Sequence, residues 1–382
     1  MPFTKEVFKI IFIGILLRLI LVTVIDTTLR VEFSTPFNSY KGLKEGISYY
    51  RKGISPFHGD TVHQSILLIS FFSILPEWMH YVVFIIIDVV SSLLFAKWAS
   101  KNNKMEYHNA IIICNAMSST CFDHFLVLLA LNASQKGSFG ICSVALGVAA
   151  NFSIYPFFYV FPTAIMFDSS FKFRSTIILA SSVISIFSLF VGFSYYLIGS
   201  FDFIKSNYVD MLTVSDLSPN IGIFWYFFTE MFEHFRTFFL FAFQLCVFSY
   251  FIPSSIKFRQ YPDFLVVLIA GIISIFKTYP SYHDTGFFLS FVALYYNTFP
   301  NLRRGFIALN LILFSMILGP TFWYLWIYHG GGNVNFFYSS TLMLSIGQIF
   351  LLSDMAFEIL KLDHLKNNPN LPKEDIDHLV LE

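Results

Sequence analysis

Long apolar stretches separated by short polar connections follow one another from residue 7 to beyond residue 350. Such stretches are typical of helices that cross a bilayer, and each crossing needs about 20 residues. The pattern therefore predicts an all-α, polytopic transmembrane helix bundle of about ten to twelve spans. Several stretches are shorter than a straight crossing requires, so we expect some to be broken or re-entrant. The predicted spans are 7–25, 64–75, 79–98, 107–131, 138–150, 152–168, 176–199, 221–251, 263–277, 286–299, 304–328 and 336–361.

Composition agrees with this class. The chain is 56% hydrophobic and only 13% charged, with 50 Phe, whereas a soluble domain carries about 25% charged residues. Its 24 basic and 24 acidic residues balance, and no long basic run occurs. Nucleic-acid binding needs a clustered basic face, so no nucleic-acid partner is expected. The first apolar segment is followed by no small-residue cleavage site, and we expect it to be a retained helix.

Two polar segments interrupt the pattern. Residues 26–63 are too long for a simple turn and are expected to form a lumenal loop. Residues 40–50 of this loop suit a short amphipathic helix, whose side chains Leu43, Ile47 and Tyr50 we expect at the membrane interface. The second segment is the charged tail. The chain is thus divided into one polytopic membrane domain, 1–361, and a polar C-terminal tail, 362–382.

Ionisable residues stand inside one of the most aromatic stretches, residues 219–235. Ionisable groups are costly in hydrocarbon and tend to face a bundle interior, a cavity or a ligand. Glu230 and His234 are four residues apart and would share one face of a continuous helix. We expect this pair to support the fold and subunit docking. A surface for lipid headgroups or a partner is the alternative.

Cations follow two of the predicted spans. Lys257 and Arg259 close the aromatic stretch and could bind lipid phosphates, or simply set membrane topology. Lys277 precedes the helix-breaking Pro280. Its ammonium could reach the interface or form an ion pair inside the bundle.

The loop 328–338 joins two strong spans and contains three successive glycines, Gly330 to Gly332. Glycines let a ligand approach the main chain closely. Asn333 and Asn335 then offer amide donors and acceptors that suit sugar hydroxyls or phosphate. The alternative is a tight turn between helices, because asparagine tolerates unusual turn geometry.

Signs of catalysis are missing from the sequence. It has no metal-binding or nucleophile motif, and its four cysteines lie in apolar stretches without metal or disulfide spacing. We therefore expect no catalytic residue, no metal and no cofactor. After the first span Glu32 stands as a lone acid, whereas an Asp-rich pair there would indicate a lipid-linked-sugar transferase. The sequons at Asn132 and Asn151 fall at or within predicted spans and are expected to be unused.

Several segments, in order along the chain, resemble the PIG-U family, the polytopic subunit of the glycosylphosphatidylinositol (GPI) transamidase. The stretch 219–234 is the longest and most specific of them. The others are the Ser-Pro-Phe of 55–57 with His63-Gln64, and 275–280, 325–328, 333–338 and 347–354.

The resemblance implies a GT-C-glycosyltransferase-like bundle in the endoplasmic reticulum membrane and a non-catalytic role in GPI-anchor attachment. The implied partners are the caspase-like catalytic subunit PIG-K, PIG-T, PIG-S and the metallopeptidase-like GPAA subunit. The GPI glycolipid would be bound with Asn333 and Asn335 at its headgroup, and the chain could also present the protein's C-terminal signal. Membrane phospholipid is a further expected partner.

Two other functions stay open. An active lipid-linked-sugar glycosyltransferase of GT-C type would need an acidic partner for Glu32. A transporter would show an internal repeat with broken helices around a midplane site, and the proline-interrupted segments near Pro156 and Pro280 are weak signs of one.

Overall fold

A computed structural model describes residues 30–59, 61–101, 117–167 and 173–368. Within these ranges all regular structure is helical, which confirms the predicted all-α class. The predicted span 7–25 and the tail from residue 369 lie outside the described residues. The chain divides into two compact units between Leu294 and Tyr295. Each unit is described by itself, and the prediction of a single membrane domain stays a prediction.

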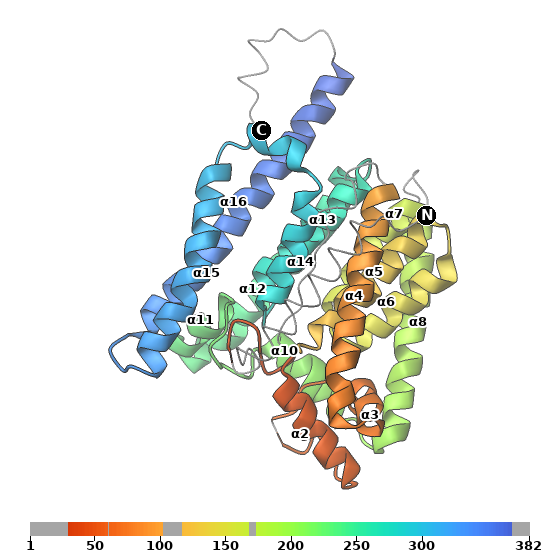
Figure 1. Cartoon of the computed structure of the whole chain (residues 1–382). Helices are drawn as coiled ribbons and strands as arrows, with labels where there is room; N and C mark the ends of the chain where they lie inside the picture. The colour runs from red at the N-terminus through yellow and green to blue at the C-terminus, as the bar shows by residue number, and fades with distance from the viewer. Residues whose placement is uncertain (1–29, 60, 102–116, 168–172, 369–382) are drawn as a thin grey trace. The chain divides into compact units, whose positions relative to one another are not determined.

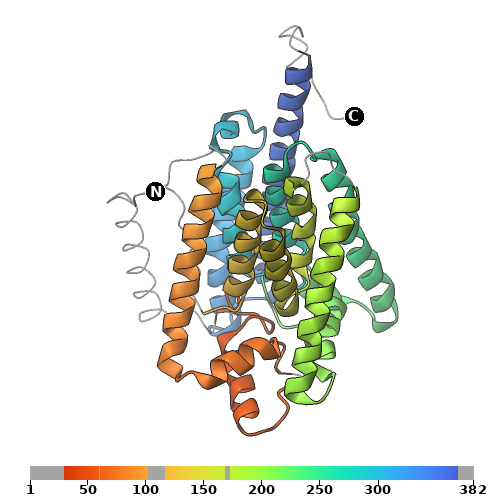
Figure 2. The ribbon, with the colours of Figure 1, turned by 90° about the vertical axis from the view of Figure 1, so that its right-hand side faces the viewer.

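Four helices of the first unit lie side by side in chain order: α4 (Glu77–Lys101), α5 (Thr120–Gln135), α6 (Phe139–Phe152) and α8 (Phe173–Ile198) (Figure 2). The turn between α5 and α6 is three residues long and uses Gly137 at φ +75°. Helices α6 and α8 meet closely at Gly147, where an added Cβ would lie 2.6 Å from Ile186 Cγ2. A small residue in α6 thus sets the spacing of this layer.

Helix α13 (Pro262–Phe276) is the most buried element of the first unit. Every residue from Phe264 to Ile275 is buried, because the helix is apolar on all faces and packs on α7 (Val160–Phe167), α12 (Glu233–Lys257) and α14 (Tyr282–Ala293). A helix that is apolar all round belongs in a protein interior or a membrane. Here it forms a central core helix (Figure 1).

The predicted amphipathic helix of the long polar loop is present as α2 (Tyr40–Arg51), which begins at the N-cap Ser39. Its apolar face does not lie at a membrane interface as expected. Leu43 and Ile47 are buried in a protein core with Ile66, Ile69 and Phe72, and the last three belong to α3 (Ile66–Ile74). The fit to α3 is close, since a Cβ at Gly46 would lie 2.9 Å from Ile69 Cδ1. The amphipathic pattern reports packing inside the protein.

The predicted span 221–251 is broken into α11 (Phe224–Glu230) and α12 (Glu233–Lys257). The two residues between them, Met231 and Phe232, have extended backbone with ψ of 142° and 134°. Short elements precede this break: the 3₁₀ turn Tyr155–Tyr159 before α7, then α9 (Asp202–Ile204), a π-helical turn (Lys205–Val209) and α10 (Asp210–Thr213).

The second unit is a helical hairpin of α15 (Gly305–Ile327) and α16 (Val334–Asn367), preceded by the 3₁₀ turn Tyr296–Asn301 (Figure 1). Gly347 lets the helices approach, because a Cβ there would lie 3.0 Å from the carbonyl oxygen of Ala308. Near the start of α15, Asp354 accepts hydrogen bonds from the Arg304 backbone N–H at 2.6 Å and from the guanidinium Nη2 at 2.6 Å.

Five helices in the described ranges are long and apolar enough to cross a membrane: α4, α8, α12, α15 and α16. Shorter apolar helices occur at 139–152, 155–167 and 262–276. The chain is therefore polytopic, as predicted, and the shortness of several spans is confirmed. The total of ten to twelve crossings and the GT-C likeness stay predictions.

Candidate functional site

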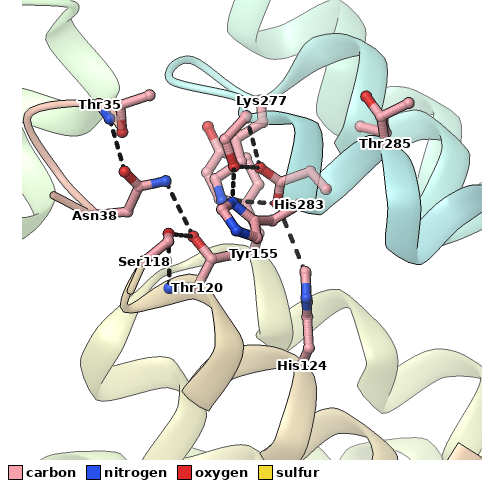
Figure 3. Close-up of polar contacts among 12 residues, drawn as sticks. Thr35, Asn38, Ser118, Thr120, His124, Tyr155, Lys277, His283 and Thr285 are labelled. Carbon is pink, nitrogen blue, oxygen red and sulfur yellow. Dashed lines mark hydrogen bonds and ion pairs between the residues drawn. The ribbon is translucent and has the colours of Figure 1, made fainter. Parts of the chain in front are cut away.

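Figure 3 shows polar contacts around His124, Tyr155 and Lys277 in the first unit. With Asp123 and Asp284 these make a group of five polar residues, of which all but the half-buried Asp123 are buried. We call them the buried charge cluster. The Lys277 ammonium lies 2.9 Å from Asp284 Oδ1, and the His124 Nε2 lies 3.8 Å from the same oxygen. Lys277 is 8% exposed and Asp284 5%. The sequence left two positions open for the Lys277 ammonium, at the membrane interface or in an internal ion pair, and the structure shows the ion pair.

The break between α13 and α14 creates the ion pair. Helix α13 ends at Phe276, and Lys277 has extended backbone with ψ of 139°. Helix α14 then begins with a capping box, in which Asp284 Oδ2 accepts from the Ser281 backbone N–H at 2.9 Å and from its hydroxyl at 3.1 Å. Asp284 therefore caps α14 with one carboxylate oxygen and binds Lys277 with the other.

Tyr155 connects the 3₁₀ turn before α7 to the same break. Its hydroxyl lies 2.9 Å from Thr278 Oγ1 and accepts from the Thr278 backbone N–H at 2.9 Å. The Lys277 ammonium lies 5.7 Å from the centre of the Tyr155 ring. Tyr155 thus hydrogen-bonds to Thr278, the residue after Lys277, and makes a cation–π contact with the lysine itself.

The loop that follows the first predicted span closes over the cluster. The Asn38 amide donates to Thr120 Oγ1 at 3.1 Å, and the Ser119 backbone N–H donates to the Asn38 carbonyl at 3.0 Å (Figure 3). The Phe37 ring stacks on His63 at 4.5 Å and on Tyr279 at 4.4 Å between ring centres. Residues from the loop, α5 and the α13–α14 break therefore form one polar core.

Glu32 lies in this loop and is 1% exposed. Its backbone carbonyl accepts from the Tyr282 N–H at 2.8 Å, while neither carboxylate oxygen has a hydrogen-bond partner among the described residues. Burial raises the pKa of the Glu32 carboxyl above its usual range. A side chain so enclosed is poorly placed to meet a sugar donor.

Glu230 and His234 do not form the pair on one helical face that the sequence predicted. Because the helix breaks at Met231 and Phe232, the two residues belong to different helices and share no helical face. Both side chains are exposed. The four-residue spacing was misleading, since it indicates a common face only where the helix is continuous. Their role in docking stays a prediction.

Lys257 is the last residue of α12, and Arg259 follows in the next turn. Both are exposed, which suits either lipid phosphates or ordinary topology-setting charges. Lipid binding by these two residues stays a prediction.

The glycine loop joins α15 to α16, and its geometry explains much of its sequence. Gly330 has φ +67°, and a Cβ at Gly332 would lie 2.9 Å from the Trp326 backbone nitrogen. The N–H groups of Gly331 and Gly332 both donate to the Leu325 carbonyl. The turn itself therefore requires glycine at positions 330 and 332.

Asn333 is the N-cap of α16, and its Oδ1 accepts from the Asn335 backbone N–H at 3.1 Å. Asn333, Asn335 and Phe336 are exposed, with Phe336 at 55%. Trp326 packs toward Phe337, with ring centres 6.5 Å apart. The capping role uses the side-chain oxygen of Asn333. Both asparagines lie on an accessible surface.

The described ranges also show where potential metal ligands, cysteines and sequon residues lie. No group of three or more His, Cys, Asp or Glu side chains gathers there to hold a metal ion. Cys121 and Cys142 are buried and Cys246 is exposed, while Cys114 lies outside the described residues. The sequon residues Asn132 and Asn151 are 6% and 2% exposed, and their amides donate to helix carbonyls of Leu128 and Gly147.

Sequence reasoning missed most of the buried charge cluster. Asp123, His124 and Asp284 come from apolar segments, and no local motif links them to Lys277. A usable signal was present, because an ionisable residue inside an apolar segment is a functional or structural hypothesis by default.

Fold and cluster together define a polytopic membrane protein with a polar, ion-paired interior. The sequence matches the family model described as GPI transamidase subunit PIG-U over residues 12–111 and 109–344. The chain belongs to the PIG-U family, which confirms the resemblance.

Proteins of similar sequence match this chain over most of its length. The GPI-anchor transamidase component PIGU of Mus musculus is 31% identical over 384 residues, covering 88% of this chain and 88% of the relative. The protein of the same name from Homo sapiens is 31% identical over 385 residues with the same coverage. The GPI transamidase component GAB1 of Saccharomyces cerevisiae is 30% identical over 356 residues, covering 89% of this chain and 90% of the relative.

Proposed function

We propose that this chain is a non-catalytic subunit of a GPI transamidase, which binds the GPI glycolipid and presents it for attachment to proteins. Family membership and the names of the relatives support the subunit role. The polytopic helical fold supports a membrane location, and we assign the chain to the endoplasmic reticulum membrane because GPI attachment takes place there in the family.

Catalysis by another subunit is part of this proposal. Two of the three described cysteines are buried, and the third lies on an apolar helix, α12. The enclosed Glu32 argues against sugar transfer by this chain. A caspase-like subunit PIG-K would supply the nucleophile, and PIG-T, PIG-S and the GPAA subunit would complete the assembly.

The observation that carries glycolipid binding is the exposed loop at the α15–α16 turn. A glycolipid headgroup presents hydroxyls and phosphates, which need hydrogen-bond partners that are accessible and uncharged or cationic. Asn333 and Asn335 supply two amides on an exposed loop, with the exposed ring of Phe336 beside them. The order of residues thus places polar groups next to an aromatic surface that suits stacking on a glycan.

The test must separate ligand contact from helix capping. Serine is a good N-cap, so Asn333→Ser keeps the start of α16 while removing the amide, and Asn335→Ala removes the second amide without touching the cap. Each unmade hydrogen bond costs about 1–3 kcal/mol, so the double variant should use GPI roughly ten-fold or more less efficiently. Asn310→Ala is the control, because Asn310 is a half-buried asparagine of α15 that donates to its own helix.

Attachment of GPI to a reporter protein is measured under limiting glycolipid, together with recovery of the other subunits. We expect normal assembly and reduced attachment for the double variant. Normal assembly with attachment at the wild-type rate would show that the glycolipid does not depend on these amides.

A further inference from the structure

Two small, partly open cavities lie in the polar core of the first unit, and they share the four wall residues Thr120, Asp123, Ser153 and Lys277. The first cavity extends toward His124 and Asp284, and the centre of a water molecule can occupy about 30 Å³ of it. The second extends toward Thr35 and Gln64, with about 20 Å³ for a water centre. The shared wall makes them neighbours on either side of Asp123.

Buried polar atoms without protein partners line both cavities. Gln64 Oε1 and Thr35 Oγ1 belong to residues of the second cavity, His124 Nδ1 to the first, and Asp123 Oδ1 and Ser153 Oγ to both. None of the five has a hydrogen-bond partner in the part of the chain that the structure describes. Gln64, Thr35, Ser153 and His124 are all at most 5% exposed. Buried polar groups in folded proteins are almost always hydrogen-bonded to protein or ordered water.

The chemistry of these atoms selects the ligand. Gln64 Oε1 accepts only, whereas the Asp123 carboxyl accepts when ionised and can both accept and donate when protonated. Where His124 Nε2 carries the proton toward Asp284, its Nδ1 is an acceptor as well. The two hydroxyls can accept or donate. Lys277 has three N–H donors and one described hydrogen bond, to Asp284, so its remaining donors are available at the shared wall. A ligand here must be small and must both donate and accept.

We propose that the two cavities form one internal hydration site, in which about three ordered water molecules complete these hydrogen bonds, with Asp123 and Lys277 at the junction. Each water needs roughly 10–15 Å³ and two to four polar partners, and the cavities and their walls supply both. A metal ion is disfavoured, since the Lys277 ammonium lines both cavities and no suitable ligand group gathers in the described ranges.

The site links elements that are distant in sequence. Its walls come from the loop after the first predicted span, from α5, from the segment before the 3₁₀ turn and from the α13–α14 break. Water bridges between them hold the loop onto the helices, in addition to the direct Asn38–Thr120 hydrogen bond.

The experiment uses the chain purified together with the subunits that accompany it. A cryo-electron microscopy map that resolves ordered solvent should show separate density peaks within hydrogen-bond distance of Asp123 and Ser153. Well-defined side chains in this region with no density between them would overturn the proposal.

Substitutions give a second test, in which the melting temperature rises or falls according to whether the cavity holds water. Ser153→Val fills a wet polar cavity with methyl groups, so we expect the melting temperature to fall by several degrees, whereas in a dry cavity the same change would raise it. Ser153→Ala leaves room for water and should change it little. Ser143→Val is the matched control, because Ser143 is equally buried but bonds to Gly140 of its own helix.

Ion dependence separates water from a bound cation. At constant ionic strength, replacing choline chloride by sodium, potassium or ammonium chloride should leave the melting temperature of the wild-type chain unchanged. Stabilisation by one of these cations that Asp123→Asn abolishes would show an ion site and contradict a site for water alone. Stabilisation of the protein by Ser153→Val would also contradict the proposal, because it would indicate a dry cavity.

Discussion

Asp284 and Lys277 lie seven residues apart, and their carboxylate and ammonium meet at 2.9 Å across the break between α13 and α14. Both are buried, and the same carboxylate also caps α14 and faces His124. Removing one partner of a buried ion pair leaves an uncompensated charge in a medium of low polarity, which is much more costly than losing an exposed pair.

Lys277→Met or Asp284→Leu should each lower the free energy of unfolding by about 3–5 kcal/mol. The double variant should lose less than the sum of the two, because no isolated charge remains. Thermal unfolding of the purified chain measures this. The control is Lys44→Ala, which breaks an ion pair of the same 2.9 Å length whose side chains are 53% and 60% exposed, and it should change stability little. Equal effects at both pairs would contradict a special role for burial.

Glu32 predicts a pH-dependent stability. Burial raises its pKa in the folded chain, so the folded state binds the proton more tightly than the unfolded state does. The destabilising cost of ionisation is therefore absent below the ordinary carboxyl pKa of about 4 and grows as pH rises through the raised pKa. Glu32→Gln should be more stable than the wild type at neutral pH, with the difference vanishing near pH 4. Thermal unfolding at the two pH values measures it, and a less stable variant at neutral pH would mean that the carboxylate is bound by a donor.

Gly147 predicts a steric effect between α6 and α8. An added Cβ would lie 2.6 Å from Ile186 Cγ2, so Gly147→Ala should destabilise the chain by about 1–3 kcal/mol. Ile186→Ala in the same chain should recover most of that loss. Gly192→Ala in α8, where a Cβ would meet nothing within 4 Å, should be neutral or slightly stabilising. Thermal unfolding compares all four chains, and a neutral Gly147→Ala would show that the helices can separate freely.

The apolar pattern was enough to place most helices. The predicted spans 176–199, 304–328 and 336–361 correspond to α8, α15 and α16, because uninterrupted apolar runs of this length form helices in a membrane. The error at 221–251 has a local cause. Nothing in the aromatic run marks Met231 and Phe232 as extended, since neither is a glycine or a proline.

The candidate site was harder to predict than the helices. The glycine loop could be found from its sequence, because three glycines followed by two asparagines are unusual between apolar spans. The buried charge cluster depends on tertiary packing that brings residue 123 beside residue 284. Their association is set by how α5 packs against α14, which no local periodicity encodes.

Helix length has a consequence for the membrane itself. Helix α5 has 16 residues and its neighbour α4 has 25, so their lengths are about 24 Å and 37 Å, against about 30 Å of hydrocarbon. Helices α6 and α13 are shorter still, with 14 and 15 residues. Non-helical backbone at that depth survives only where protein encloses it or water reaches it. Helix α13 is enclosed by protein, whereas α6 exposes Ile141 and Val144. A bilayer beside α6 therefore thins to match the short helix, and a polar headgroup crosses a thinner hydrocarbon layer there.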